Sequence, residues 1–113
     1  MAQEFVYHPI GNYQIKKQPS EVITIRGIFN EVLEDGENID VNNSTVTVYD
    51  SNNQDVTSTM LVSNSVKTDP TNTKLQCRIK SGTDGQRYKV SLIAVTSEGN
   101  AYEMDVFMDI IEV

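Results

Sequence analysis

Cysteine, histidine and tryptophan are nearly absent from this sequence of 113 residues. Cys77 is the only cysteine, so the chain forms no intramolecular disulfide, which suits a protein assembled in a reducing cytoplasm. Cys77 falls in phase with Leu75 and Ile79 on an expected strand, and we therefore predict that its side chain is small, apolar and buried. The length suits one domain, because a chain of this size buries roughly two-thirds of the surface that it exposes when unfolded.

The shortage of histidine also argues against catalysis. His8 is the only histidine, and the sequence pairs it with no nucleophile and no orienting group. The acidic runs at residues 35–40 and 50–55 resemble calcium loops superficially, but both lack the full set of alternating Asp/Asn ligands, the glycine at the sixth position and the final glutamate of an EF-hand. We interpret both runs as solvated turns, and we expect no enzymatic activity, no cofactor and no metal site.

Positive charge is scarce, since nine Lys and Arg face sixteen Asp and Glu for a net charge of −7. This balance disfavours nucleic-acid binding, which needs clustered cations to displace counterions. Lys74, Arg78 and Lys80 share one strand face, which we interpret as solvated. No apolar run is long enough for a signal peptide or a membrane span, so we expect no membrane contact and no entry into the secretory route by the chain itself.

A long β-hairpin at residues 84–113 is the strongest pattern that is present. Apolar residues alternate along both of its strands, which predicts one buried face. The predicted inward residues are Tyr88, Val90, Leu92, Ala94, Tyr102, Met104, Val106, Met108 and Ile110. Glycine and asparagine at residues 97–100 predict the turn. With Ala94 placed opposite Met104, Lys89 is expected to face Asp109.

The outer face of this hairpin is unusually apolar. A solvated face should be polar, yet several apolar side chains point away from the expected core. They are Ile93, Val95, Phe107, Ile111 and Val113. Either another segment of the chain covers this face or a partner does.

Residues 1–16 are interpreted as an N-terminal arm, because their apolar residues show no clean alternation. These residues include Phe5, Tyr7, Ile10 and Tyr13. The segment is too apolar for a typical disordered tail and needs a surface to cover. The exposed face of the hairpin, in the same copy or in a neighbouring copy, is a candidate for that surface.

Residues 17–113 form the predicted domain. Strands are expected at residues 21–29, 44–49 and 73–79, with one or two short strands within 56–66. About seven strands with regularly spaced turns predict an all-β fold, an antiparallel immunoglobulin-like β-sandwich, and a small barrel is the alternative. Tyr88 follows a short turn and precedes Val90 by two positions, which is typical of the structural tyrosine corner of such sandwiches.

Several local patterns occur together. Lys17 and Pro19 precede the strand that begins Glu21-Val22-Ile23, an acidic glycine-containing connection spans 34–39, and a Val/Thr strand spans 45–49. The last third of the sequence contains the pattern Gly82-x-x-Gly85-x-x-Tyr88-x-Val90, and Gly99 precedes the last expected strand. Together these features resemble immunoglobulin-like structural proteins of tailed phages and prophages, of the kind described as fibre–tail adaptors, over residues 17–113.

The resemblance implies a virion structural protein at the tail or head–tail region, made in the bacterial host cytoplasm, with other virion proteins as partners. Self-association through the N-terminal arm is a further expectation. The alternative function is a β-sandwich module that binds carbohydrate or another host-surface ligand. Such modules present aromatic platforms, so clustering of Tyr7, Tyr13 and Tyr49 on one surface would favour it.

Overall fold

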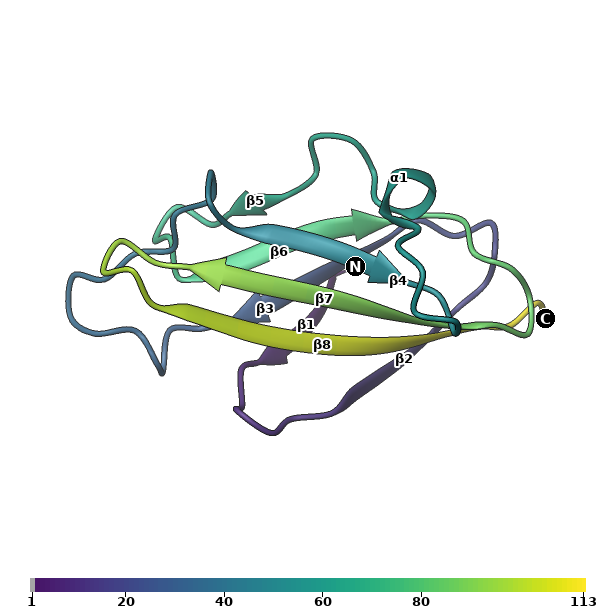
Figure 1. Ribbon diagram of the computed structural model, residues 1–113, viewed down its shortest axis with the longest axis horizontal. Coiled ribbons are helices and arrows are strands. Elements are labelled where there is room, and N and C mark those ends of the chain that lie inside the picture. The colour runs from purple at the N-terminus through teal and green to yellow at the C-terminus, as the bar shows by residue number, and fades with distance from the viewer. Residues whose placement is uncertain (1) are drawn as a thin grey trace.

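A computed structural model describes residues 2–113 and shows two β-sheets packed face to face (Figure 1). Met1, the first residue of the predicted arm, lies outside this range. The elements are β1 (Ala2–Val6), β2 (Tyr13–Lys17), β3 (Ile23–Ile28), β4 (Thr45–Tyr49), α1 (Thr57–Met60), β5 (Lys67–Thr68), β6 (Lys74–Ile79), β7 (Arg87–Val95) and β8 (Ala101–Ile110).

Each sheet has four strands. The first sheet has the order β1-β3-β6-β5, and the second, which we call the hairpin sheet, has the order β2-β8-β7-β4. In Figure 1 the hairpin sheet lies in front of the first sheet. The prediction of an all-β sandwich is confirmed, and the barrel alternative is wrong because the two sheets are separate. The predicted strand number was too low, since the described chain contains eight strands.

The additional strands come from the N-terminal segment. β1 pairs in parallel with β3 at the edge of the first sheet, and β2 pairs in parallel with β8 at the edge of the hairpin sheet. The chain therefore changes sheets between residues 6 and 13, which interrupts any alternation after five residues. The segment extends one edge of each sheet and does not lie on the outer face of the terminal hairpin.

The core lies between the sheets and follows the predicted alternation of β7 and β8. Tyr88, Val90, Leu92 and Ala94 are buried, as are the inward residues of β8 from Met104 onward, whereas Tyr102 is half-buried. Cys77 is fully buried, as predicted, and burial raises the pKa of its thiol to about 12.

Gly27 allows the two sheets to approach closely. A Cβ atom at this position would lie 2.9 Å from Cε2 of Phe29 and 3.2 Å from Sδ of Met104. The strand pairing of Gly27 with Leu75 is regular, so the glycine serves packing between the sheets and makes no bulge.

The turn of the terminal hairpin lies at the predicted residues, but it sets a different register. Gly99 has a φ of 82° and donates its N–H to the carbonyl of Thr96, and the N–H of Thr96 donates to the carbonyl of Asn100. The loop of three residues therefore ends in a left-handed glycine, as is common in β-hairpins. Ala94 therefore faces Tyr102, not Met104. The shift is two residues, so it leaves the inward and outward faces unchanged.

The predicted pairing of Lys89 with Asp109 is consequently wrong. Lys89 lies opposite Phe107, and Arg87 lies opposite Asp109.

The segment 56–66 also differs from its prediction of short strands. It contains the helix α1, which buries Met60. The strand β5, which has two residues, follows this segment in the sequence. The carboxylate of Asp55 accepts the N–H of Thr57 and favours the helical turn over an extended chain.

Candidate docking surfaces

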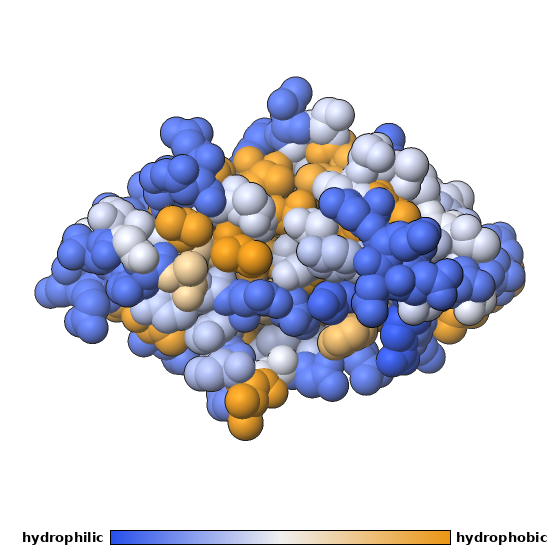
Figure 2. All heavy atoms as spheres, viewed as in Figure 1, coloured by the Kyte–Doolittle hydropathy of each residue, from blue (hydrophilic) through white to orange (hydrophobic). Residues whose placement is uncertain are grey.

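The outward side of the hairpin sheet, which we call the hairpin face, is ordered in rows by the strand register. One row contains Gln14, Phe107, Lys89 and Tyr49, and the row beyond it contains Lys16, Asp109 and Arg87. Toward the other end of the strands, the next row contains Asp105, Ser91 and Thr47. The row after it contains Glu103, Ile93 and Thr45. Figure 2 looks onto this face and shows apolar side chains interspersed with polar ones.

The structure places most of the predicted apolar outer residues on one face, with the row of Asp105 between Ile93 and Phe107. Ile93, Val95 and Phe107 lie on the hairpin face and are half-buried by their lateral neighbours. Ile111 follows β8 and is 41% exposed. No described segment of the chain crosses this face, so the side chains remain available to a partner.

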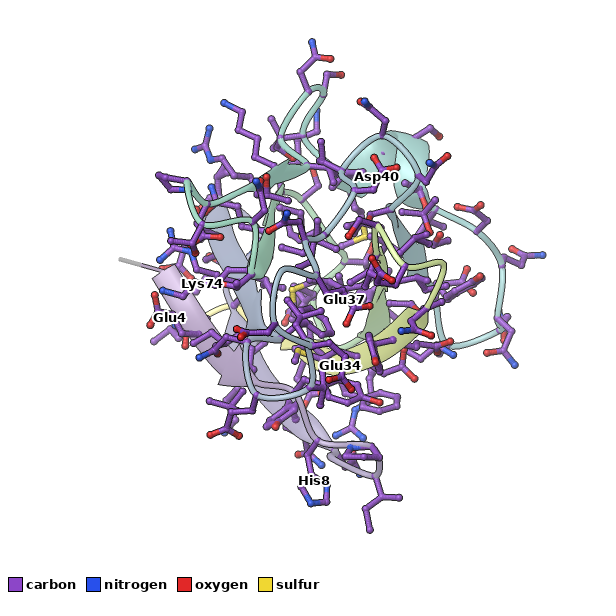
Figure 3. The ribbon with its side chains drawn as sticks, turned by 90° about the vertical axis from the view of Figure 1, so that its left-hand side faces the viewer. Glu4, His8, Glu34, Glu37, Asp40 and Lys74 are labelled. Carbon is purple, nitrogen blue, oxygen red and sulfur yellow. The ribbon has the colours of Figure 1, made fainter. Side chains whose placement is uncertain are left out.

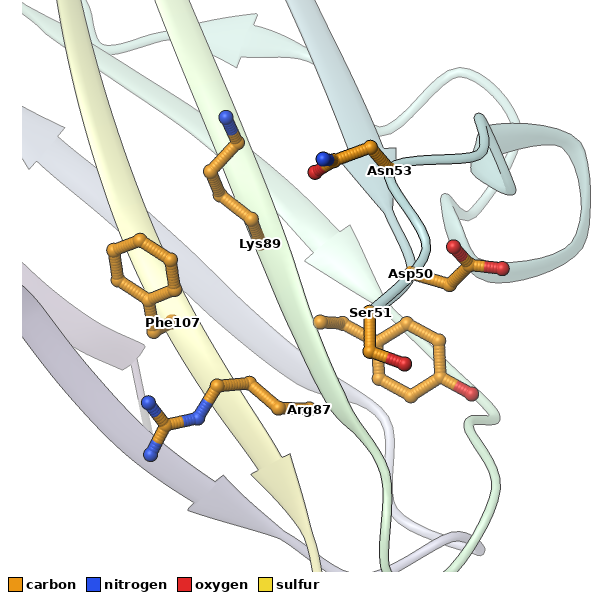
Figure 4. A pocket seen from close by; sticks show the side chains of 7 residues that line it. Asp50, Ser51, Asn53, Arg87, Lys89 and Phe107 are labelled. Atoms are coloured by element: carbon orange, nitrogen blue, oxygen red, sulfur yellow. The ribbon is translucent and has the colours of Figure 1, made fainter.

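A hollow of about 320 Å³ opens beside Phe107 on the hairpin face. Figure 4 shows Phe107 flanked by Arg87 and Lys89, with the loop after β4 on the other side. Arg87 binds both carboxylate oxygens of Asp109, at 2.7 and 3.1 Å, and this contact lowers the pKa of Asp109. Lys89 lies 5.0 Å from the ring centre of Tyr49. This part of the face is therefore cationic and aromatic.

The opposite part of the face is anionic. Glu103 and Asp105 are neighbours on the same side of β8. Oδ1 of Asp105 is buried, and it has no hydrogen-bond partner among residues 2–113. Hydrogen bonding to Asp105, burial and the Asp105 charge raise the pKa of Glu103, while Ser91 and Lys89 partly offset the effect. The positive charge near the two carboxylates is therefore too small to offset the causes that raise the pKa of Glu103.

The predicted arm residues divide into a packed group and an exposed one. Phe5 packs on Tyr13 with ring centres 4.9 Å apart. Tyr7 packs on Phe29 at 5.3 Å and on Tyr102 at 5.5 Å. Ile10, at the crossing between the sheets, is 86% exposed.

The tyrosines do not form one platform. Tyr13 belongs to β2, whereas Tyr49 belongs to β4 at the opposite edge of the same sheet. Tyr7 packs on the core residue Phe29. The clustering that would favour a carbohydrate-binding module is therefore missing from the described chain.

Tyr88 is buried at the start of β7. Its hydroxyl oxygen accepts the backbone N–H of Thr83 at 3.0 Å. This contact connects the strand to the turn that precedes it. The side chain of Tyr88 belongs to the buried core cluster.

Sequence reasoning missed a buried carboxylate at Glu37, which it assigned to a solvated turn. Glu37 is 3% exposed and accepts hydrogen bonds from Glu34 N at 2.8 Å, from Asn100 Nδ2 at 2.9 Å and from the Thr96 hydroxyl. These contacts lower its pKa. They join the acidic connection to the tip of the terminal hairpin, at the end of the sandwich shown in Figure 3. No local sequence signal separates Glu37 from its exposed acidic neighbours.

Lys17 was also missed as a buried residue. It is 2% exposed, and its ammonium group donates to the carbonyls of Gln18, at 2.8 Å, and Ser81. Burial lowers its pKa, and Glu21 partly counteracts this. The signal available in the sequence was that Lys17 lies two positions after Ile15, and therefore on the same inward face of β2. A buried lysine on an edge strand also discourages pairing with foreign strands.

No group of three or more His, Cys, Asp or Glu in the described chain is arranged to hold a metal ion. Among residues 2–113, no helix has the length and apolar character needed to cross a bilayer.

The class of protein that these features define is an all-β sandwich with a partly apolar, uncovered sheet face. The chain belongs to the family of the podophage GP4 fiber-tail adaptor protein gp77, whose family model matches residues 17–109. Membership in this family makes it a phage tail structural protein and a virion component. Neither the curated proteins nor the solved structures include a match to this chain.

Proposed function

We propose that the protein is a non-enzymatic adaptor module in the fibre–tail region of the particle, which docks onto other virion proteins through its hairpin face. The observation that carries this proposal is the group of Ile93, Val95 and Phe107 on a sheet face that no described segment covers. Docking of an apolar sheet face is shape-matched, and many copies in one particle multiply a modest contact through effective concentration.

The module in this proposal is an immunoglobulin-like sandwich, formed by residues 17–113 and preceded by an arm. The orders β3-β6-β5 and β8-β7-β4 support it, because immunoglobulin domains have the orders ABED and CFG, and β1 of the arm takes the place of strand A beside β3. The hydroxyl of Tyr88 that binds upstream backbone supports a tyrosine corner. The parallel pairing of β1 with β3 is a variation at the edge of this arrangement.

The N-terminal arm supplies a second contact in this proposal. Phe5, Tyr7 and Tyr13 fix the segment on its own copy, and Ile10 stands exposed at the crossing between the sheets. An isolated exposed isoleucine at the tip of a well-anchored segment suits insertion into a neighbouring protein of the assembly, a second copy included. Synthesis in the host cytoplasm precedes this assembly.

Particle incorporation tests the proposal. Phage lacking the gene is complemented with the wild-type protein, with Phe107→Asp or with Ser63→Asp, a matched control in an exposed loop. Purified particles are then analysed by mass spectrometry. We expect wild type and the control in particles, and a folded Phe107→Asp protein that is absent from them. Wild-type protein absent from particles, or Phe107→Asp incorporated at the normal level, would contradict the proposal.

A further inference from the structure

We propose that the hollow beside Phe107 receives an apolar side chain with a carboxylate next to it, from an acidic segment of the virion protein onto which this chain docks. The inference rests on the proposed docking function and deepens it, because it states the chemistry of the partner. Three observations support it: the lining of the hollow, an ammonium group without an ion pair, and the opposite charge at the other end of the face.

The hollow has an aromatic side and a polar side. Phe107 on β8 forms the first, residues 50–53 after β4 form the second, and the side chains of Arg87 and Lys89 on β7 lie between them (Figure 4). The volume of about 320 Å³ is small for a binding site, so it suits one large side chain and not a folded element. A single buried anchor of this kind carries much of the binding energy in many interfaces.

The polar side of the hollow is held in place by its own hydrogen bonds. Oδ1 of Asp50 accepts the N–H groups of Asn52 and Gln54, both at 2.9 Å, and the N–H of Asn53 donates to the carbonyl of Asp50 at 3.0 Å. Figure 4 shows the Asp50 carboxylate pointing away from the hollow and the Asn53 amide pointing toward Lys89. The loop is therefore ordered in the free protein, which lowers the entropic cost of binding.

Lys89 supplies the positive charge of the hollow. Both ion pairs among residues 2–113 are formed by arginines, so the ammonium of Lys89 has no carboxylate within ion-pair distance there. It lies 5.0 Å from the ring centre of Tyr49, and the lysine side chain is half-buried. The three donors of this group are therefore available to a carboxylate, and a charge-assisted hydrogen bond is stronger than a neutral one.

The other end of the hairpin face gives the contact a direction. Glu103 and Asp105 lie there, on the far side of Phe107 from Arg87. They repel a second carboxylate, whereas Lys89 attracts it. An acidic segment is therefore held at the end of the face that contains the hollow, and a segment that is basic there is rejected.

A small probe with the same chemistry tests the hollow. Phenylpropionate combines an aromatic ring with a carboxylate, and phenylpropionamide is its neutral counterpart. Both are titrated into the isotope-labelled full chain, and backbone amide shifts are followed by NMR. We expect the largest shifts at Asn53, Lys89 and Phe107, with a Kd on the order of 1–10 mM because so few atoms make contact. The carboxylate should bind about three- to fivefold more tightly than the amide, and high salt should reduce this difference.

Two variants separate the ammonium from the general charge of the face. Lys89→Gln removes the ammonium at the hollow, whereas Lys16→Gln removes an equal charge from the same face outside the hollow. We expect Lys89→Gln to bind phenylpropionate only as well as wild type binds the amide, and Lys89→Arg to bind it more tightly than Lys89→Gln. Lys16→Gln should stay within about twofold of wild type. The spectra show at once whether each variant is folded.

Several results of the titration would overturn the inference. One is the absence of shifts near Phe107 at tens of millimolar probe, and another is equal binding of the acid and the amide. Equal weakening by Lys89→Gln and Lys16→Gln would show a general effect of charge. Shifts confined to Arg26, Lys74 and Arg78 would place the acidic contact on the first sheet instead.

Particles extend the test to the partner. In the complementation experiment, we expect Lys89→Arg to be incorporated and Lys89→Glu to be excluded. Changes elsewhere in the phage that restore incorporation of Lys89→Glu should replace an aspartate or glutamate of another virion protein. Normal incorporation of Lys89→Glu, or restoring changes that leave the acidic residues of the other virion proteins untouched, would contradict an acidic partner.

The outcomes separate this inference from the proposed function. Wild-type protein that is absent from particles would overturn the adaptor function, while the titration still decides the chemistry of the hollow. Exclusion of Phe107→Asp together with normal incorporation of Lys89→Glu would support docking through the hairpin face and overturn the acidic segment.

Discussion

The two outer faces of the sandwich differ in chemistry although both come from regularly alternating strands. The outer side of the first sheet is mostly polar, and its main groups contact each other. Arg26 forms an ion pair with Glu4 and donates through Nε to Gln76 at 3.0 Å. On the hairpin face, Ile93 and Phe107 lie on either side of the row of Asp105, whose buried Oδ1 has no partner among the described residues. The polar groups of the first face pair with each other, and the hairpin face is the one that we propose to dock.

The inner faces do not distinguish the two sheets. Both sheets alternate correctly toward the core, so folding is specified equally well by either. Only the residues between the core positions distinguish the faces. A polar outer set such as Thr24, Arg26 and Gln76 indicates solvent, and a mixed set such as Ile93 and Phe107 indicates contact.

The largest expected effect removes the core that supports both faces. Phe29 is fully buried and contacts the ring of Tyr7. Phe29→Ala should lower the free energy of unfolding by about 3–5 kcal/mol, because it removes a large apolar side chain and leaves a cavity. Urea denaturation followed by circular dichroism measures this loss. A change below about 1 kcal/mol, closer to that of a surface substitution, would show that Phe29 is not packed as described.

A smaller effect concerns the acidic connection at the end of both sheets. The hydrogen bonds to Glu37 lower its pKa below the ordinary value of 4.5. The ionised carboxylate therefore stabilises the fold above this pH, and the contribution is lost as pH falls through the lowered pKa. Glu37→Gln should lower Tm at pH 7 and should weaken the loss of stability in acid. An unchanged acid profile, measured by thermal denaturation beside the exposed control Glu34→Gln, would contradict this role.

A third effect sharpens the contrast at the hairpin face. The pKa of Glu103 is raised above 4.5, so ionisation is less favourable in the folded chain than in the unfolded chain. This costs stability as pH rises through the raised pKa. Glu103→Gln should therefore raise Tm slightly at pH 7, measured by thermal denaturation at low salt. Glu98→Gln, in the exposed turn, should not, and a lower Tm for Glu103→Gln would argue against repulsion.

The smallest effect is expected on the first sheet. Glu4 and Arg26 form an ion pair whose side chains are 47% and 28% exposed. Such pairs contribute little, because water and salt screen them. Glu4→Gln should change the free energy of unfolding by no more than about 0.5 kcal/mol and should leave incorporation into particles unchanged. A loss of incorporation in this variant would place the docking contact on the first sheet and reverse the comparison between the faces.

The sequence predicted the parts of the fold that follow from a long period of two. The nine residues of β7 and ten residues of β8 are long enough for alternation to identify their inward faces. The same pattern identified Ile93 and Phe107 as outward residues. β1 and β2 have five residues each and join different sheets, so no comparable period exists there.

Other features depended on contacts between distant residues. The register of the terminal hairpin follows from the left-handed Gly99, and a loop with two candidate residues for positive φ does not specify it. The burial of Glu37 depends on Thr96 and Asn100, which lie 59 and 63 positions away. The charge separation of the hairpin face likewise appears only when the register places Lys89 beside Phe107.

The single cysteine has a further consequence. Cys77 lies in the centre of the first sheet, and its pKa of about 12 leaves almost no thiolate at neutral pH. A thiol reagent therefore reacts with it only when the sandwich opens, so the labelling rate reports the population of open molecules. In an assembled particle, the labelling rate of Cys77 therefore reports how often each sandwich opens. Slower labelling in particles than in free protein would show how much the assembly stabilises the closed sandwich.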